Sequence, residues 1–198
     1  MRPKTILLLC LGIIIAACNQ DAPGSYRSNA LEEHLQNPLF AEQYFESLVQ
    51  RMVELVIRQD PIMDNEEKKA IADSVRQEGL KKAKQATQTQ LKGTFGEFMA
   101  ASEWAKGATL YVNDTIYFGP NFQVDPGPSL HVFLTTVVDP RMESFPDSSA
   151  LDLGQIQNMI ADQSYPTPNV ENPLLYRTVV LFDTVLERIY AFAQLSPF

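Results

Sequence analysis

Only a few side chains in this sequence could carry out chemistry, and they are mainly thiols and imidazoles. The chain has two cysteines and two histidines, His34 and His131. Cys18 directly follows Ala16 and Ala17, at the end of an apolar run. Small residues at these positions are typical of a site that signal peptidase cuts. A cut there would make Cys18 the first residue and the only cysteine of the mature chain. Its sulfur would then carry lipid, and no thiol would remain for a disulfide, a metal or redox chemistry.

The residues before Cys18 are organised like an export signal. Arg2 and Lys4 give a positively charged start, and residues 6–15 form an apolar core. This core is too short to cross a bilayer, which takes about 20 apolar residues. The ending resembles the lipobox of bacterial lipoproteins, which implies a diacylglyceryl thioether on Cys18 and stable anchoring by two or three acyl chains. The alternatives are an ordinary secretory signal, or an uncleaved anchor in which Cys18 has no role.

The residue after Cys18 bears on which membrane would hold the lipid. In the common sorting rule, an aspartate at that position retains a lipoprotein in the inner membrane, and here the residue is Asn19. The resemblance therefore implies a protein that is lipid-anchored in the outer membrane. The periplasmic face and the outer face both stay open.

The charge of the chain excludes one large class of partner. The sequence carries 16 basic and 24 acidic side chains, a formal net charge of −8. Without residues 1–17, which hold Arg2 and Lys4, the balance is 14 against 24, or −10. Nucleic-acid-binding proteins carry the opposite charge, so we expect no nucleic-acid partner. From Gly107 onward three basic residues stand against ten acidic ones. The preceding part is mixed in charge, which suggests two structural units.

The remaining candidate residues do not form a recognised catalytic motif. The sequence has no Gly-x-Ser-x-Gly, no Gly-x-Gly-x-x-Gly and no Walker motif. One histidine and no free thiol after residue 90 cannot make a zinc site by the usual spacing rules. An acidic loop could bind Ca²⁺, but its spacing fits no known loop and favours a solvated surface. The members of that loop are Asp139, Glu143, Asp147 and Asp152. We therefore expect no enzyme activity, no metal and no cofactor.

The hydrophobic pattern divides the chain into four segments. We predict a signal peptide over 1–17, a polar tether over 18–28, a helical hairpin region over 29–90 and a β domain over 91–198. Apolar residues recur at helical spacing from Pro38 to Gln59, and a second helix begins at Asp64 with capping-box spacing to Glu67. The predicted fold class is mainly β, a small antiparallel β-sandwich or barrel, preceded by an α-helical hairpin and α+β overall.

From about residue 94 the pattern changes to the alternation of strands. Residues 110–112 and 115–118 predict a hairpin that turns at Asn113-Asp114. Residues 130–138 predict a central strand, because both of its faces are partly apolar. His131 lies within that strand, where a buried histidine usually donates to a carbonyl or carboxylate; a ligand or catalytic role is the alternative. Residues 178–182 and 189–195 predict two more strands, and 140–168 is expected to be rich in loops.

Five short motifs follow one another in the predicted β domain. They are Lys-Gly-Thr-Phe at 92–95, Gly-Pro-Ser-Leu-His-Val-Phe-Leu at 127–134, Leu-Asp-Leu-Gly at 151–154, Asp-Gln-Ser-Tyr-x-x-Pro at 162–168, and the two strands at 178–182 and 190–195. In this order they resemble the DM-thirteen domain family. The family has a glycine before Asp-Gln, where this chain has Ala161. The resemblance covers about residues 92–195 and leaves the helical region out.

The resemblance implies an all-β fold and points to one strand. An electron-transfer role proposed for the family rests on a cysteine in the penultimate strand. Here that position falls on or beside Phe182-Asp183, and no thiol is present. Asp183 and His131 are therefore the candidate functional positions of the β domain.

Two functions remain after these exclusions. The leading prediction is a lipid-anchored cell-envelope protein that acts as a non-catalytic binding or assembly module, with an envelope protein as its candidate partner. The alternative is an electron-transfer accessory domain that holds an extrinsic cofactor near His131.

Overall fold

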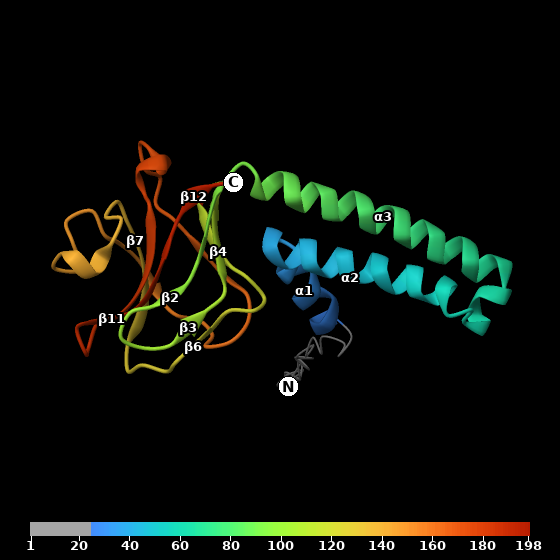
Figure 1. Cartoon of the computed structure of the whole chain (residues 1–198), viewed down its shortest axis with the longest axis horizontal. Coiled ribbons are helices and arrows are strands. Elements are labelled where there is room, and N and C mark those ends of the chain that lie inside the picture. The colour runs from blue at the N-terminus through green and yellow to red at the C-terminus, as the bar shows by residue number, and fades with distance from the viewer. Residues whose placement is uncertain (1–24) are drawn as a thin grey trace, which may run out of the picture.

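A computed structural model of the chain describes residues 25–198. The predicted signal peptide, the lipid site at Cys18 and most of the tether lie outside the described residues. Within the described part, three α-helices precede twelve short antiparallel strands (Figure 1). The predicted fold class, mainly β and α+β overall with a helical hairpin in front, is confirmed.

The helical region begins earlier than the sequence pattern predicts. Helix α1 spans Ser25–His34, so it starts inside the segment predicted as tether. Helix α2 spans Pro38–Ile57, the short 3-10 helix η1 spans Pro61–Asp64, and α3 spans Glu66–Gln90. The predicted capping box from Asp64 is wrong, because the side chain of Asn65 caps α3 by accepting a hydrogen bond from the Lys68 amide.

Helices α2 and α3 form an antiparallel hairpin that projects from one side of the β domain (Figure 1). The α3 side of the contact consists of small residues seven, four and three positions apart, which places them on one face of the helix. These buried residues are Ala72, Gly79, Ala83 and Ala86. A Cβ atom on Gly79 would lie 2.8 Å from Cγ2 of Val49, which shows how closely the two helices approach. The hairpin therefore has a thin interior and leaves many apolar side chains on its surface.

The strands form two five-stranded sheets and one two-stranded ribbon. The first sheet has the order β12-β1-β4-β5-β9, the second β2-β11-β10-β7-β8, and β3 pairs with β6. The bounds are β1 Thr94–Glu97, β2 Met99–Ala100, β3 Ala105–Lys106, β4 Ala108–Val112, β5 Thr115–Phe118, β6 Gln123–Val124, β7 Leu130–Thr135, β8 Leu151–Gln155, β9 Gln163–Pro166, β10 Thr178–Asp183, β11 Arg188–Gln194 and β12 Ser196–Pro197. Over residues 25–198 no sheet closes into a barrel.

The main core lies between the two large sheets. It includes Ile116 and Phe118 from the first sheet and Val132, Val179 and Ala191 from the second. A smaller cluster on the outer face of the second sheet joins Phe133, Val180, Phe182 and Phe192, and Phe145 packs against it. Strand β7 lies between β10 and β8 and contributes to both clusters, as predicted for a central strand. It ends at Thr135 rather than at Val138.

Local turn chemistry explains one success and one error of the sequence analysis. Asn113 and Asp114 have φ values of 50° and 53°, so the predicted two-residue turn between β4 and β5 is a left-handed one. The stretch 140–168, predicted as loop, contains β8 and β9. Both are edge strands, and the alternation of β8 covers only Leu151, Asp152 and Leu153 before Gly154 at φ 105° interrupts it.

Candidate functional site

The helical region is joined to the β domain by a buried asparagine. Asn37 begins α2, and its side-chain oxygen accepts a hydrogen bond from the Leu39 amide at 3.0 Å. The side-chain amide of the same residue donates to the carbonyl oxygen of Phe118 in β5, at 2.8 Å. Asn37 is only 4% exposed. One side chain therefore caps a helix and fixes that helix to the sheet.

Beside this junction, a histidine and an aspartate far apart in the sequence form a pair. His34 ends α1, and its Nδ1 lies 2.9 Å from Oδ2 of Asp162. The His34 side chain is 45% exposed, as predicted, but the Asp162 side chain is only 6% exposed. The carboxylate therefore holds the imidazole by Nδ1, and Nε2 has no hydrogen-bond partner among residues 30–198.

The motif at 162–168 positions this aspartate through two buried side chains. The side-chain oxygen of Gln163 accepts hydrogen bonds from the backbone amides of Gln157 and Asn158 and from the Tyr165 hydroxyl. The Tyr165 hydroxyl in turn accepts from the Gln157 amide at 3.0 Å. Burial raises the pKa of Tyr165 to about 12. These hydrogen bonds of Gln163 and Tyr165 fix the loop before β9, and they thereby fix the position of Asp162, which precedes Gln163.

The residue before Asp162 has a strained backbone. Ala161 has φ 97°, a conformation that favours glycine. This is the position at which the DM-thirteen pattern has glycine. Strain of this kind clusters at functional sites.

We expect Ala161→Gly to stabilise the chain by about 0.5–1 kcal/mol, because glycine adopts this φ without the penalty that a Cβ brings. Urea unfolding measures the change. Ala101→Gly is the matched control, since Ala101 is exposed and is absent from the positive-φ residues. A loss of stability in Ala161→Gly as large as that in the control would contradict the strain.

The pair opens onto a polar cleft of about 430 Å³ between α1 and the edge of the first sheet. Its walls are Ala30, Glu33, His34, Gln36 and Asn37 from the helical region, and Thr115, Tyr117, Gln157, Asn158, Asp162, Gln163, Ser164 and Pro166 from the β domain. Among residues 30–198, whose side chains the structure describes, two carboxylates line it and no lysine or arginine does. A concave site with a few convergent polar groups is the usual form of a small-molecule site.

The predicted position His131 has a carboxylate partner. Its Nδ1 lies 3.0 Å from both oxygens of Asp152 in the neighbouring strand β8. The His131 side chain is 23% exposed and that of Asp152 is 45% exposed. The pair therefore matches the preferred interpretation of a strand histidine that is satisfied by a carboxylate.

The other predicted position, Asp183, is buried, and backbone amides donate hydrogen bonds to both oxygens of its carboxylate. It accepts hydrogen bonds from the amides of Ser129, Val185 and Leu186. Burial raises the pKa of the Asp183 carboxyl, but these amide hydrogen bonds outweigh it and hold the pKa below its ordinary value. A Cβ atom on Gly127 would lie 2.5 Å from its Oδ2, so the Gly-Pro motif passes directly over the carboxylate. Asp183 thus ties two loops together.

Three of the four carboxylates of the acidic loop have separate partners. Asp139 pairs with Arg141, Asp147 binds Thr135 and Ser149, and Asp152 binds His131. Glu143 is exposed. In the part of the chain that the structure describes, no group of three or more metal-ligating side chains is gathered.

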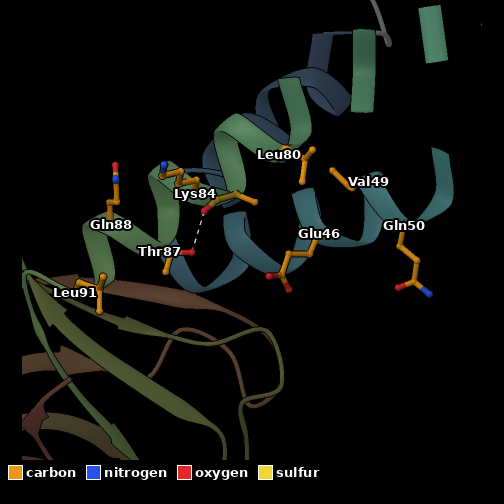
Figure 2. A pocket seen from close by; sticks show the side chains of 9 residues that line it. Glu46, Val49, Gln50, Leu80, Lys84, Thr87, Gln88 and Leu91 are labelled. Carbon is orange, nitrogen blue, oxygen red and sulfur yellow. Dashed lines mark hydrogen bonds between the residues drawn. The ribbon is translucent and has the colours of Figure 1, made fainter. Parts of the chain in front are cut away.

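A second concave surface lies on the hairpin, and it is more apolar than the cleft at the His34–Asp162 pair. This groove, of about 620 Å³, runs between α2 and α3. Its floor includes Val49 and Leu80, which face each other in Figure 2, and its edges carry Glu46 on α2 and Lys84 on α3. We call this surface the hairpin groove. It is an apolar strip with polar edges, the form that binds amphipathic helices.

No family model, no curated protein and no solved structure matches this chain. The resemblance to the DM-thirteen family therefore stays a prediction that rests on the five motifs. None of the described helices has the length and apolar character needed to span a membrane.

The His34–Asp162 pair and the cleft were not found from the sequence. The sequence predicts Asp162 only as part of a motif and His34 only as an exposed residue of the helical region, and nothing in it pairs the two. The sequence signal that could have revealed this site is the Asp-Gln-x-Tyr motif. Its three named residues are all buried in the structure: the polar residues Asp162 and Gln163 are 8% and 6% exposed, and Tyr165 is 2% exposed.

The Tyr165 hydroxyl allows a test of how the cleft is held. We expect Tyr165→Phe to reduce the free energy of unfolding by about 1 kcal/mol, because it removes the two hydrogen bonds of a buried hydroxyl, with the Gln157 amide and the Gln163 oxygen, while each of those groups keeps a second partner. Tyr117→Phe on the adjacent strand is the control, because Tyr117 is half-buried and its hydroxyl has no hydrogen bond within residues 25–198. Equal losses in the two variants, measured by urea unfolding, would contradict the network.

Proposed function

We propose that this chain is a lipid-anchored protein of the bacterial outer membrane and acts as a non-catalytic binding or assembly module. The lipobox-like ending at Cys18 supports the anchor. The binding role is supported by one observation above all, the polar cleft built jointly by α1 and the β domain around the His34–Asp162 pair. A cleft that needs both units is a reason for the two units to be held together.

The anchor has a direct test. Mass spectrometry of protein from its native host should find residues 1–17 removed and the Cys18 sulfur acylated. An unmodified sulfhydryl, or an intact leader, would overturn the anchor.

The binding role is tested with protein purified from the native membrane. It is incubated with a small-molecule extract of the envelope, and retained compounds are identified by mass spectrometry. Ser164→Trp fills the cleft from an exposed position on β9, and Glu143→Trp places the same side chain on an exposed loop elsewhere. We expect compounds that wild type and Glu143→Trp retain and Ser164→Trp does not. Identical retention by all three proteins would overturn the role of the cleft.

The assembly role would use the hairpin groove. The partner that we propose there is an envelope protein that presents an amphipathic helix, with a basic edge toward Glu46 and an acidic edge toward Lys84. Leu80→Lys should abolish its site-specific cross-linking to the groove. Ile71→Lys is the control, because Ile71 is exposed on the opposite side of α3, nine residues or about 180° away. Equal cross-linking of both variants would overturn this partner.

The electron-transfer alternative predicts an optical signature. Protein purified from the native membrane would then show a Soret or flavin absorption band. We expect neither band, and finding one would replace the non-catalytic role.

A further inference from the structure

The cleft contains a buried carboxylate that the protein itself only half satisfies. The Asp162 side chain is 6% exposed, and within residues 25–198 His34 is its one hydrogen-bond partner, through Oδ2. The second oxygen, Oδ1, has no such partner, and Asp162 lines the cleft. A buried carboxylate is costly unless donors surround it. Oδ1 is not among the buried side-chain atoms that lack a partner, so it is reached from the cleft, where a ligand that displaces water can donate to it.

The surroundings of Asp162 favour a positively charged donor. Glu33, in the last turn of α1, adds a second carboxylate to the wall. Among the residues whose side chains the structure describes, 30–198, no lysine or arginine lines the cleft. Each of these features lowers the potential in the cleft.

The rest of the wall suits a polar ligand body. Thr115, Asn158 and Ser164 offer hydroxyl and amide groups, which can both donate and accept hydrogen bonds. Tyr117 adds an aromatic side chain to the wall. These groups would hold a small hydrophilic molecule rather than an acyl chain.

We propose that the cleft binds a protonated primary amine carried by a small polar molecule, with Oδ1 of Asp162 and the Glu33 carboxylate as its acceptors. This ligand class deepens the proposed binding function and rests on it. The amine could belong to an amino sugar or to a lysine-like side chain, which share this chemistry.

The test compares amines with their acetylated counterparts by isothermal titration calorimetry on the full mature protein. The probes are glucosamine against N-acetylglucosamine, and Nα-acetyl-lysine amide against its Nε-acetylated form. Acetylation removes the charge and keeps the rest of the molecule. We expect at least one free amine to bind at least tenfold more tightly than its acetylated form. The pair that shows the difference identifies the source of the amine.

Variants assign the effect to the two carboxylates. Asp162→Asn and Glu33→Gln should each weaken binding of the free amine at least fivefold, and Glu143→Gln, an exposed acid elsewhere, should leave it unchanged. Glu33 is exposed, so Glu33→Gln keeps the test valid if Asp162→Asn fails to fold. Equal affinity for amine and acetylated amine, or binding of neither, would overturn the proposal. In both cases the binding function survives if the envelope extract yields a cleft-dependent compound.

Discussion

Replacing Asp183 with alanine should reduce the free energy of unfolding by about 3–5 kcal/mol, the largest effect that we expect of a polar substitution in this chain. The carboxylate accepts hydrogen bonds from the amides of Ser129, Val185 and Leu186 at 2.8–3.0 Å. Its side chain is fully buried. Alanine would leave these three backbone amides without an acceptor. Each amide then lowers the free energy of unfolding by its full desolvation penalty, because no other acceptor replaces the carboxylate.

Asp152→Ala is the control for this experiment. Asp152 is hydrogen-bonded too, to His131 and to the backbone amide of Gly154, but its side chain is 45% exposed. Water can replace its interactions, so we expect a loss of no more than about 1 kcal/mol. Urea unfolding of both variants measures the difference. Similar losses would mean that Asp183 does not tie the two loops together.

The same carboxylate makes the stability of the chain depend on pH. Its pKa in the folded state lies below that of the unfolded chain, so its contribution is present above about pH 4. As the pH falls through the folded pKa, the carboxylate takes up a proton and the contribution is lost. The unfolding free energy of wild type should therefore fall more steeply below pH 4 than that of Asp183→Ala. Parallel curves would contradict this assignment.

Replacing Asn37 with alanine should cost about 2–4 kcal/mol and loosen the helical region from the β domain. Two losses combine in this variant. The cap of α2 disappears, which costs about 1 kcal/mol. The buried carbonyl of Phe118 also loses its donor, which costs about 1–3 kcal/mol more.

Asn65→Ala separates the two losses. Asn65 caps α3 in the same way, by accepting from the Lys68 amide, but it is exposed and contacts no strand. We expect it to cost only the cap, about 1 kcal/mol. Hydrogen exchange should in addition show faster exchange of the β5 amides in Asn37→Ala and not in Asn65→Ala. The same cost and the same exchange in both variants would show that Asn37 only caps its helix.

Much of the fold follows from local patterns. The stripe of apolar residues from Ala41 to Leu55 recurs every three or four positions, which predicts α2. The pair Asn113-Asp114 between two alternating runs predicts the β4–β5 hairpin, since both residue types tolerate positive φ. Strand β8 escapes such reasoning, because its alternation is only three residues long before Gly154 interrupts it.

The sequence by itself determined the helical hairpin and the β domain after it, because each depends on residues that are neighbours along the chain. The lipid on Cys18 stays a prediction from the same kind of local pattern. Only the tertiary structure decided that His34 meets Asp162 across 128 positions, and that Asn37 holds the Phe118 carbonyl. Such pairs depend on how a helix docks against a sheet. That docking is set by the summed packing of many buried side chains, which no short stretch of sequence contains.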